Sequence, residues 1–160
     1  MAAEDVFTAE LNEPEMAALA QKLAPLLKRR DCIALYGDLG AGKSSFIRAC
    51  IHALAKAKEV PSPTFTLVQT YESPAGALWH FDLYRVKKTS EILELGWDEA
   101  LHDGIIFVEW PERLGALLPQ RHLAIHLNFH QDSAKRRISI QGDAPWPLRL
   151  SPVLPKAAKM

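Results

Sequence analysis

The chain has 160 residues, of which 48% are hydrophobic, so it is long enough for one domain with a well-buried core. Lysine plus arginine and aspartate plus glutamate each total 19, which excludes a net charge that would by itself attract nucleic acid or an anionic membrane. The two cysteines lack a CxxC or zinc-like spacing, and the first residues lack the features of a signal peptide. We therefore expect one globular, cytoplasmic protein without a membrane span.

The first half of the chain is predicted to form a helix, a buried strand and a second helix. Apolar residues recur at three- and four-residue spacing over 14–30, a pattern typical of a helix, although it contains the helix-kinking residue Pro25. The apolar run 32–36 ends directly before a glycine and predicts a buried strand. A helix is expected over 43–57, because its apolar residues share one face.

Two strands, at 65–71 and 77–85, are predicted to follow a Pro-flanked loop and to be joined by a turn at 73–76. The second strand alternates, and side chains that alternate along a strand point to opposite faces of the sheet. Its apolar face is expected to carry Trp79, Phe81 and Leu83. Its other face is expected to carry His80, Asp82 and Tyr84.

The second half continues with a helix expected over 89–101 and a buried strand over 104–108. Two further strands, 123–129 and 137–141, are predicted to form a hairpin. Four prolines after Gly142 predict a loosely packed tail without regular structure. These elements predict a three-layer α/β fold with a mainly parallel central sheet and a C-terminal antiparallel hairpin, divided into a domain over 1–141 and a tail over 142–160.

The turn after the first predicted strand matches the phosphate-binding pattern G-x-x-x-x-G-K-[ST]. Glycines let the backbone N–H groups of such a turn surround a phosphate at the start of a helix, whose dipole also favours an anion. Lys43 is expected to reach the terminal phosphates of ATP, and the Ser44 hydroxyl to ligate Mg²⁺. The expected nucleotide contacts in this segment are Gly37, Asp38, Leu39, Gly40, Ala41, Gly42, Lys43, Ser44 and Ser45.

An acidic residue at the end of a neighbouring strand is also needed to hold magnesium in such a site. Glu109, which ends a fully apolar run, is the stronger candidate for this role, and Asp82 is the other. Either could instead cap a strand or pair with Arg85. Thr64 and Thr66 lie in a loop where nucleotide-sensing segments occur, but hydroxyls in loops also commonly bond nearby backbone.

Four sequence blocks together resemble the TsaE family, also called YjeE. They are Tyr36 to Phe46, Ser62 to Val68, His80 to Arg85 and Val108 to Pro111. The family's phosphate-binding turn usually ends in two threonines, whereas this chain has Ser44 and Ser45, which preserve the hydroxyl. The likeness runs from about Glu13 to Gln141 and does not cover the tail.

The resemblance implies a magnesium-dependent ATPase needed to make threonylcarbamoyladenosine in tRNA. It implies work with TsaB and TsaD, after TsaC has supplied the activated intermediate, and contact with tRNA only through that complex. It also implies that Ser44 and Glu109 serve magnesium, that Asp82 takes part in hydrolysis, and that the loop from Ser62 to Thr66, which includes Thr64, senses the nucleotide. Lys43, which the motif places at the terminal phosphates, is expected to be catalytic as well.

Two other functions fit the same motif. A small P-loop kinase would need an arginine-rich lid, and no arginine-dense segment covers the middle of the chain. A nucleotide-gated binding module would use ATP only to set its shape. No arginine is evidently placed as a finger over the terminal phosphate, so slow hydrolysis by the isolated protein is expected. The adenine contacts stay open, with 11–15 and the hairpin near Lys135 as candidates.

Overall fold

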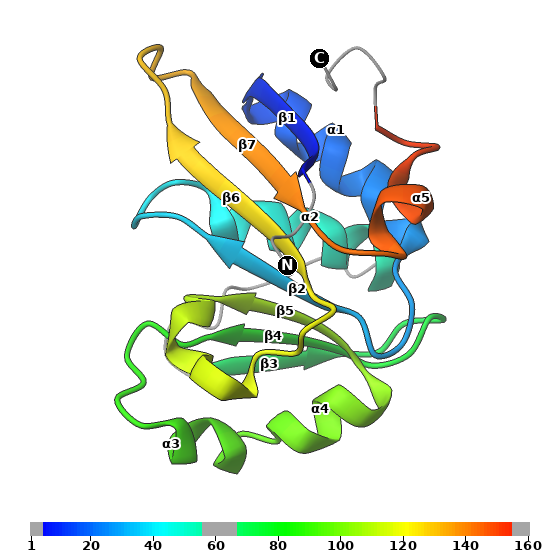
Figure 1. The fold of residues 1–160 in the computed structure, drawn as a ribbon, viewed down its shortest axis with the longest axis vertical. Helices are drawn as coiled ribbons and strands as arrows, with labels where there is room; N and C mark the ends of the chain where they lie inside the picture. Colours follow the sequence, from blue (N-terminus) through cyan, green and yellow to red (C-terminus); the bar gives the residue numbers. More distant parts are fainter. Residues whose placement is uncertain (1–4, 56–66, 155–160) are drawn as a thin grey trace.

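The computed structural model describes residues 5–55 and 67–154. Within them, seven strands form one sheet in the order β1-β7-β6-β2-β5-β4-β3 (Figure 1). The strand bounds are β1 Asp5–Asn12, β2 Cys32–Tyr36, β3 Val68–Tyr71, β4 Leu78–Asp82, β5 Ile105–Glu109, β6 Leu123–Phe129 and β7 Lys135–Gln141.

The sheet is mixed, which corrects the expectation of a mainly parallel sheet. The four central strands, β6, β2, β5 and β4, run parallel to one another. The predicted β6–β7 hairpin is confirmed, and β1 and β3 also pair antiparallel at the two edges. Because the central strands are parallel, their carboxyl ends meet at one edge, and the loops that follow β2, β4 and β5 gather there.

Helices cover both faces of the sheet. One face carries α1 (Glu13–Leu23), the 3₁₀ turn η1 (Ala24–Leu26) and α2 (Lys43–Ala55), and the other carries α3 (Thr89–Glu94), α4 (Trp97–Asp103) and the 3₁₀ segment η2 (Pro111–Leu117). A short α5 (Trp146–Leu150) packs with the α1 and α2 side.

Two predicted helices are shorter than their apolar patterns suggest. The first was expected to reach residue 30, but α1 ends at Leu23, and Pro25 lies in the 3₁₀ turn that follows. Proline has no N–H to continue the helical ladder. The helix expected over 89–101 is interrupted at Gly96, whose φ of 96° lies in the left-handed region and ends a helical run.

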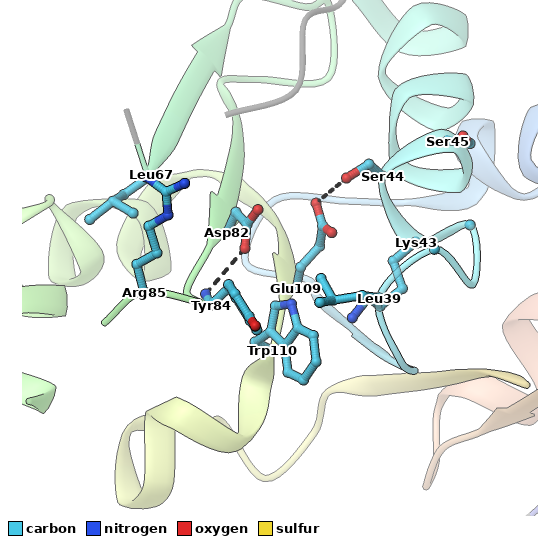
Figure 2. Close-up of a pocket in the computed structure, with 12 residues that line it drawn as sticks. Leu39, Lys43, Ser44, Ser45, Leu67, Asp82, Tyr84, Arg85, Glu109 and Trp110 are labelled. Carbon is cyan, nitrogen blue, oxygen red and sulfur yellow. Dashed lines mark hydrogen bonds between the residues drawn. The ribbon is translucent and has the colours of Figure 1, made fainter. Parts of the chain in front are cut away.

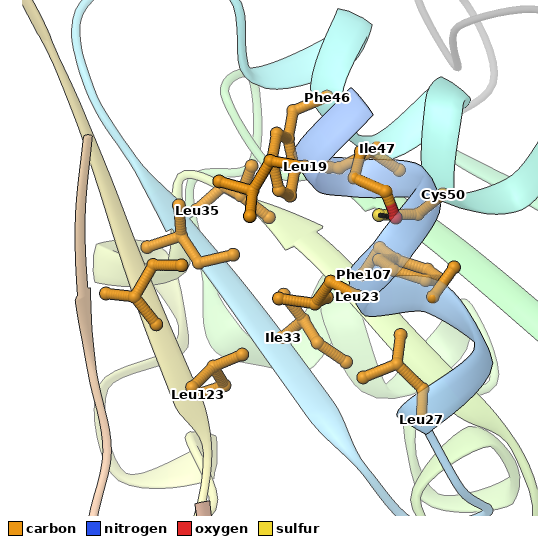
Figure 3. Packing of buried hydrophobic residues seen from close by; sticks show 14 of the residues in the cluster. Leu19, Leu23, Leu27, Ile33, Leu35, Phe46, Ile47, Cys50, Phe107 and Leu123 are labelled. Carbon is orange, nitrogen blue, oxygen red and sulfur yellow. Dashed lines mark hydrogen bonds between the residues drawn. The ribbon is translucent and has the colours of Figure 1, made fainter. Parts of the chain in front are cut away.

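The alternation of the central strands divides the interior into two apolar clusters. Ile33 and Leu35 of β2 face α1 and α2, where they join Leu23 and Ile47 (Figure 3). Phe81, from β4, faces α3 and α4 instead. The alternation predicted for 77–85 is therefore confirmed for β4, and it places His80 and Asp82 on the same face as α2.

The segment after Gly142 is packed and partly helical, so the prediction of a loose, irregular tail is wrong up to residue 154. Trp146 and Leu150 of α5 are buried in the α1 and α2 cluster. Arg149 forms an ion pair of 2.6 Å with Asp31, which directly precedes β2. Pro147 is tolerated because it lies in the first turn of the helix, where its missing N–H would be unpaired anyway. The last six residues lie outside the described part.

No helix within the described ranges is long and apolar enough to cross a membrane.

Candidate functional site

The glycine-rich turn, residues 37–42, connects β2 to α2 at the carboxyl edge of the parallel strands. Gly40 and Gly42 have φ values of 82° and 106°, a conformation in which a side chain is strained. Gly37 packs against β6 so closely that a Cβ would lie 2.6 Å from the carbonyl oxygen of Leu127. Each of these three positions therefore needs glycine for a local reason.

The turn leads into the N-terminus of α2, a helix of 13 residues. The first N–H groups of a helix have no partner within it and carry a partial positive charge. The first turn of α2 contains no acidic side chain that would offset this charge. The backbone here is therefore able to receive an anion such as a phosphate.

Lys43, the first residue of α2, is buried at this turn. Its Nζ donates a hydrogen bond to the carbonyl oxygen of Gly37 and lies 3.6 Å from the centroid of the Trp110 ring. Burial lowers the pKa of Lys43, and the carboxylates of Glu109, Glu112 and Asp82 act in the opposite direction. The ammonium group is thus fixed between the turn and the end of β5.

Glu109, the last residue of β5, is a buried carboxylate with two hydrogen-bond donors on one oxygen. Ser44 Oγ donates to Glu109 Oε2 at 2.7 Å, and His80 Nε2 lies 2.8 Å from the same oxygen. Burial raises the pKa of Glu109, but the contacts with His80 and Ser44 and the charge of Lys43 outweigh it and leave the pKa below its usual value. Glu109 is therefore held as an anion directly beside the start of α2.

Asp82, the last residue of β4, lies next to Glu109 across the parallel pair β4–β5. Its side chain is half-buried and accepts a hydrogen bond of 3.1 Å from the backbone N–H of Tyr84. Burial, followed by the charge of Glu109, raises the pKa of Asp82 above its usual value. This acid is thus easier to protonate than an ordinary aspartate.

These groups line one pocket with a volume of about 440 Å³ (Figure 2). The turn and α2 contribute Leu39, Gly40, Gly42, Lys43, Ser44 and Ser45, and the strand ends contribute Leu67, Asp82, Tyr84, Arg85, Glu109 and Trp110. The two acids and the start of α2 face the same space. Arg85 was not predicted as a site residue, yet its exposed guanidinium lines this pocket.

A second pocket of about 390 Å³ adjoins the same turn. It shares Gly40, Gly42 and Ser45 with the first pocket and continues over the β1–α1 junction and the β6–β7 hairpin. Its remaining lining residues are Leu11, Asn12, Glu13, Met16, Ala17, Ala41, Phe46, Leu127, Ser133, Ala134 and Arg136. The two regions considered as adenine contacts thus meet in one cavity next to the turn.

The donor set suits a small, hard cation. A hydroxyl that donates its hydrogen to a carboxylate keeps lone pairs for a metal ion, so Ser44 can bind Glu109 and Mg²⁺ together. In the described parts of the chain, no group of three or more His, Cys, Asp or Glu side chains is arranged to hold a metal ion. A cation at this place would therefore take most ligands from water and from phosphate oxygens, as Mg²⁺ commonly does.

The predicted residues of the turn, Asp82 and Glu109 lie together at the carboxyl edge of the parallel strands, whereas two predicted loop residues fall outside the described part. Thr64 and Thr66 lie in the segment 56–66, outside the described residues. Tyr84 and Trp110 were not predicted as site residues, although both lie within the sequence blocks that resemble the TsaE family. Tyr84 and Trp110 contact each other with ring centroids 4.9 Å apart and form one wall of the first pocket.

Comparison with known proteins identifies the family of the chain. The sequence model of the family "Threonylcarbamoyl adenosine biosynthesis protein TsaE" matches residues 11–138. The tRNA threonylcarbamoyladenosine biosynthesis protein TsaE of Rickettsia felis is 43% identical over 130 residues, which cover 81% of this chain and 75% of that protein. The protein of the same name from Bacillus subtilis is 39% identical over 116 residues, 72% of each chain.

A solved structure extends the similarity to the fold. The crystal structure of Bacillus subtilis YdiB superposes with a TM-score of 0.79 and 26% sequence identity, covering 96% of both chains. The family match covers most of the chain, and the matched segment includes the turn, Asp82 and Glu109. The chain therefore belongs to the TsaE family.

Proposed function

We propose that this protein is a P-loop ATPase that depends on magnesium and acts in the biosynthesis of threonylcarbamoyladenosine in tRNA. The family and the names of its relatives support the pathway. The observation that carries the ATPase assignment is the hydrogen bond from Ser44, in the first turn of α2, to Glu109 at the end of the adjoining strand. This contact joins the phosphate-binding side and the metal-binding side of one pocket.

The phosphates of ATP bind at the glycine-rich turn. Backbone N–H groups of the turn and of the first turn of α2 donate to phosphate oxygens, and Lys43 adds a positive charge. In this proposal the ammonium exchanges its contact with the carbonyl oxygen of Gly37 for the terminal phosphates. The move is short because Lys43 already lines the same pocket.

Magnesium is held on the side of Ser44 and Glu109. The Ser44 hydroxyl oxygen would be the direct protein ligand, and Glu109 would accept hydrogen bonds from the ligand shell. When bound, the cation neutralises charge on the phosphate oxygens. Glu109 remains ionised because its two donors and Lys43 favour the anion.

Asp82 orients the attacking water and accepts its proton. Its pKa is raised by burial and by Glu109, which brings it closer to the working pH than that of an ordinary aspartate. The backbone N–H of Tyr84 fixes one carboxylate oxygen and leaves the other for water. The environments of the two acids thus favour separate roles.

The second pocket is proposed to hold the nucleoside. It adjoins the turn through Gly40, Gly42 and Ser45, so a nucleotide with its phosphates at α2 can extend into it. Its apolar lining includes Leu11, Met16 and Phe46, which suit the flat face of a base.

The partners are proposed to be TsaB and TsaD, as the resemblance implies, with tRNA reached through their complex. Leu39 and Tyr84 at the first pocket are exposed by 61% and 43%, and exposed apolar side chains beside a polar site are common at protein interfaces. A partner bound there would adjoin the nucleotide directly.

The test is phosphate release from ATP by this protein alone, by a TsaB–TsaD complex alone, and by the mixture, with Lys43→Ala as control. The proposal expects slow release alone, a rate in the mixture that differs from the sum, and loss of the change in the variant. Additive rates, with co-purification indifferent to ATP, would refute the coupling to TsaB and TsaD. Transfer of labelled phosphate to an acceptor would instead establish a kinase.

A further inference from the structure

His80 lies inside the sheet beside the carboxylate proposed to serve magnesium. It belongs to β4 and is fully buried, on the face covered by α2. Its Nε2 is 2.8 Å from Glu109 Oε2, the same oxygen that accepts the Ser44 hydroxyl at 2.7 Å. The three side chains therefore form a continuous hydrogen-bonded row from the interior of the sheet to the start of α2.

The direction of the His80 hydrogen bond follows from the acceptor. An ionised carboxylate can only accept, so Nε2 carries the hydrogen and donates it to Glu109. In the described part of the protein, the other ring nitrogen, Nδ1, is buried and has no hydrogen-bond partner. A buried polar atom without a partner is unfavourable, and an apolar side chain at this position would avoid that penalty. Packing alone therefore does not account for a histidine here.

We propose that His80 is a positioning residue that fixes the Glu109 carboxylate for magnesium. This inference rests on the proposed magnesium-dependent binding of ATP. With both donors on Oε2, the carboxylate cannot rotate without breaking two hydrogen bonds, and Oε1 has no hydrogen bond within the described residues. Oε1 is thus left to accept from the shell of the cation, and Ser44 keeps its orientation toward the pocket.

Among the described residues, removal of His80 leaves only Ser44 as a hydrogen-bond donor to this carboxylate. Glu109 is then free to turn about its terminal bond, and the ligand shell loses a fixed acceptor. Changes in residues that orient metal ligands typically weaken metal affinity about 10- to 100-fold. The phosphates are held by the turn and Lys43, so binding of ATP without magnesium should not depend on His80.

The test compares the wild type with His80→Gln and His80→Met. The Gln amide nitrogen can reach the place of Nε2 and donate to Glu109, whereas Met has similar length and no donor. Binding of a fluorescent ATP analogue is titrated with Mg²⁺, and again in EDTA. Magnesium is expected to increase the affinity for the analogue, and the Mg²⁺ concentration that gives half of this increase is the quantity compared. We expect His80→Met to raise that concentration by about 10-fold or more. His80→Gln should recover most of this loss, and all three proteins should bind alike in EDTA.

A double-variant cycle with Glu109→Ala shows whether His80 acts through Glu109. In the Glu109→Ala background, His80→Met should cause no further loss of magnesium dependence. An equal loss in both backgrounds, or weaker binding in EDTA, would overturn the inference, because either result indicates a general structural role. If His80→Met does not fold, His80→Asn replaces it, since its amide takes the place of Nδ1 and does not reach Glu109.

The two proposals fail in different ways. If ATP binding by the wild-type protein does not depend on Mg²⁺, the proposed magnesium-dependent function is refuted, whatever the His80 variants show. A wild type that needs Mg²⁺, with His80→Met unchanged in that need, would overturn the inference alone.

Discussion

The ends of β4 and β5 each carry a carboxylate at the same level of the sheet, but the two carboxylates have opposite environments. Asp82 and Glu109 are register partners across the parallel pair. Glu109 is buried beside Ser44, His80 and Lys43, and its pKa lies below the usual value. Asp82 is half-buried, accepts one backbone hydrogen bond, and its pKa lies above the usual value because of burial and the charge of Glu109.

Strand position and local environment therefore determine two separate properties of these acids, their location and their protonation. The register brings both acids to the same pocket, whereas the donors around each acid determine its protonation. A carboxylate held ionised suits a cation, and one with a raised pKa suits proton transfer. The predictions below test whether the two strand ends differ in function as they differ in environment.

The largest effect is expected at β4. Asp82→Asn should slow single-turnover hydrolysis by about 10²-fold or more, because the amide cannot accept the proton of the attacking water. Binding of ATP with magnesium should change little, since the amide keeps the size of the side chain. Quenched-flow measurement of phosphate release, beside an equilibrium titration of the same protein, checks both. A variant that hydrolyses normally would remove Asp82 from catalysis.

At β5, Glu109→Gln should raise the Mg²⁺ concentration needed for tight ATP binding by about 10- to 100-fold. The amide lacks the negative charge that favours a cation, but it preserves most of the packing. Binding in EDTA serves as the control and should match the wild type. If Asp82→Asn shows the magnesium effect and Glu109→Gln does not, then the two roles are exchanged.

Arg85 should have a smaller effect, on the β4 side of the pocket. Its guanidinium lines the pocket and shows no hydrogen bond or ion pair with another described residue. A charge pair about 4 Å apart in water is worth about 1 kcal/mol, or roughly fivefold in affinity. Arg85→Ala should therefore weaken ATP binding by about that factor, and ADP binding less. Lys87→Ala, an exposed cation nearby that does not line the pocket, is the matched control. Equal losses in both variants would contradict a local role for Arg85.

The smallest effect is on stability, and it has opposite signs at the two acids. The raised pKa of Asp82 means that folding favours its protonated form. Its stabilising contribution to the free energy of unfolding is therefore full below pH 3.8 and is lost as the pH rises through the raised pKa. The lowered pKa of Glu109 means that folding favours its ionised form. Its stabilising contribution to the free energy of unfolding is present above pH 4.5 and is lost as the pH falls through the pKa of the folded protein. At pH 7, Asp82→Asn should raise the Tm and Glu109→Gln should lower it, each by about 1–3 °C.

Thermal unfolding without nucleotide, followed by circular dichroism across pH, measures this pair of shifts. Both differences from the wild type should shrink toward acid pH, where the carboxyl groups are protonated. Shifts of the same sign at pH 7 would show that the two environments are not opposite.

The parts of the site that were predictable from the sequence are those encoded locally. Gly37 to Ser44 form one continuous pattern, and Glu109 directly follows an apolar run, so each could be recognised without knowing the sheet. The contact of His80 with Glu109 depends on the pairing of β4 with β5, which are far apart in the chain. A single histidine in an alternating strand gave no signal of that contact.

Two elements of the fold were missed where local sequence rules were incomplete. The strand β1 was not predicted, because the pattern Val6-Phe7 breaks the alternation at an irregularity in its pairing with β7. The helix α5 was not predicted, because the prolines after Gly142 were expected to prevent regular secondary structure. Pro147 instead lies in the first turn of the helix, where proline is tolerated. The burial of α5 depends on non-local contacts, including the hydrogen bond from Trp146 Nε1 to the carbonyl oxygen of Arg121.

The most direct test of the account is equilibrium binding of a fluorescent ATP analogue to Lys43→Ala, with circular dichroism to verify folding. Lys22→Ala, an exposed lysine on α1, is the matched control. We expect Lys43→Ala to fold and not to bind the analogue, because Lys43 is the buried cation at the turn. The Lys22 variant should bind like the wild type. A folded Lys43→Ala protein that binds ATP with unchanged affinity would contradict the assignment of this turn as the phosphate site.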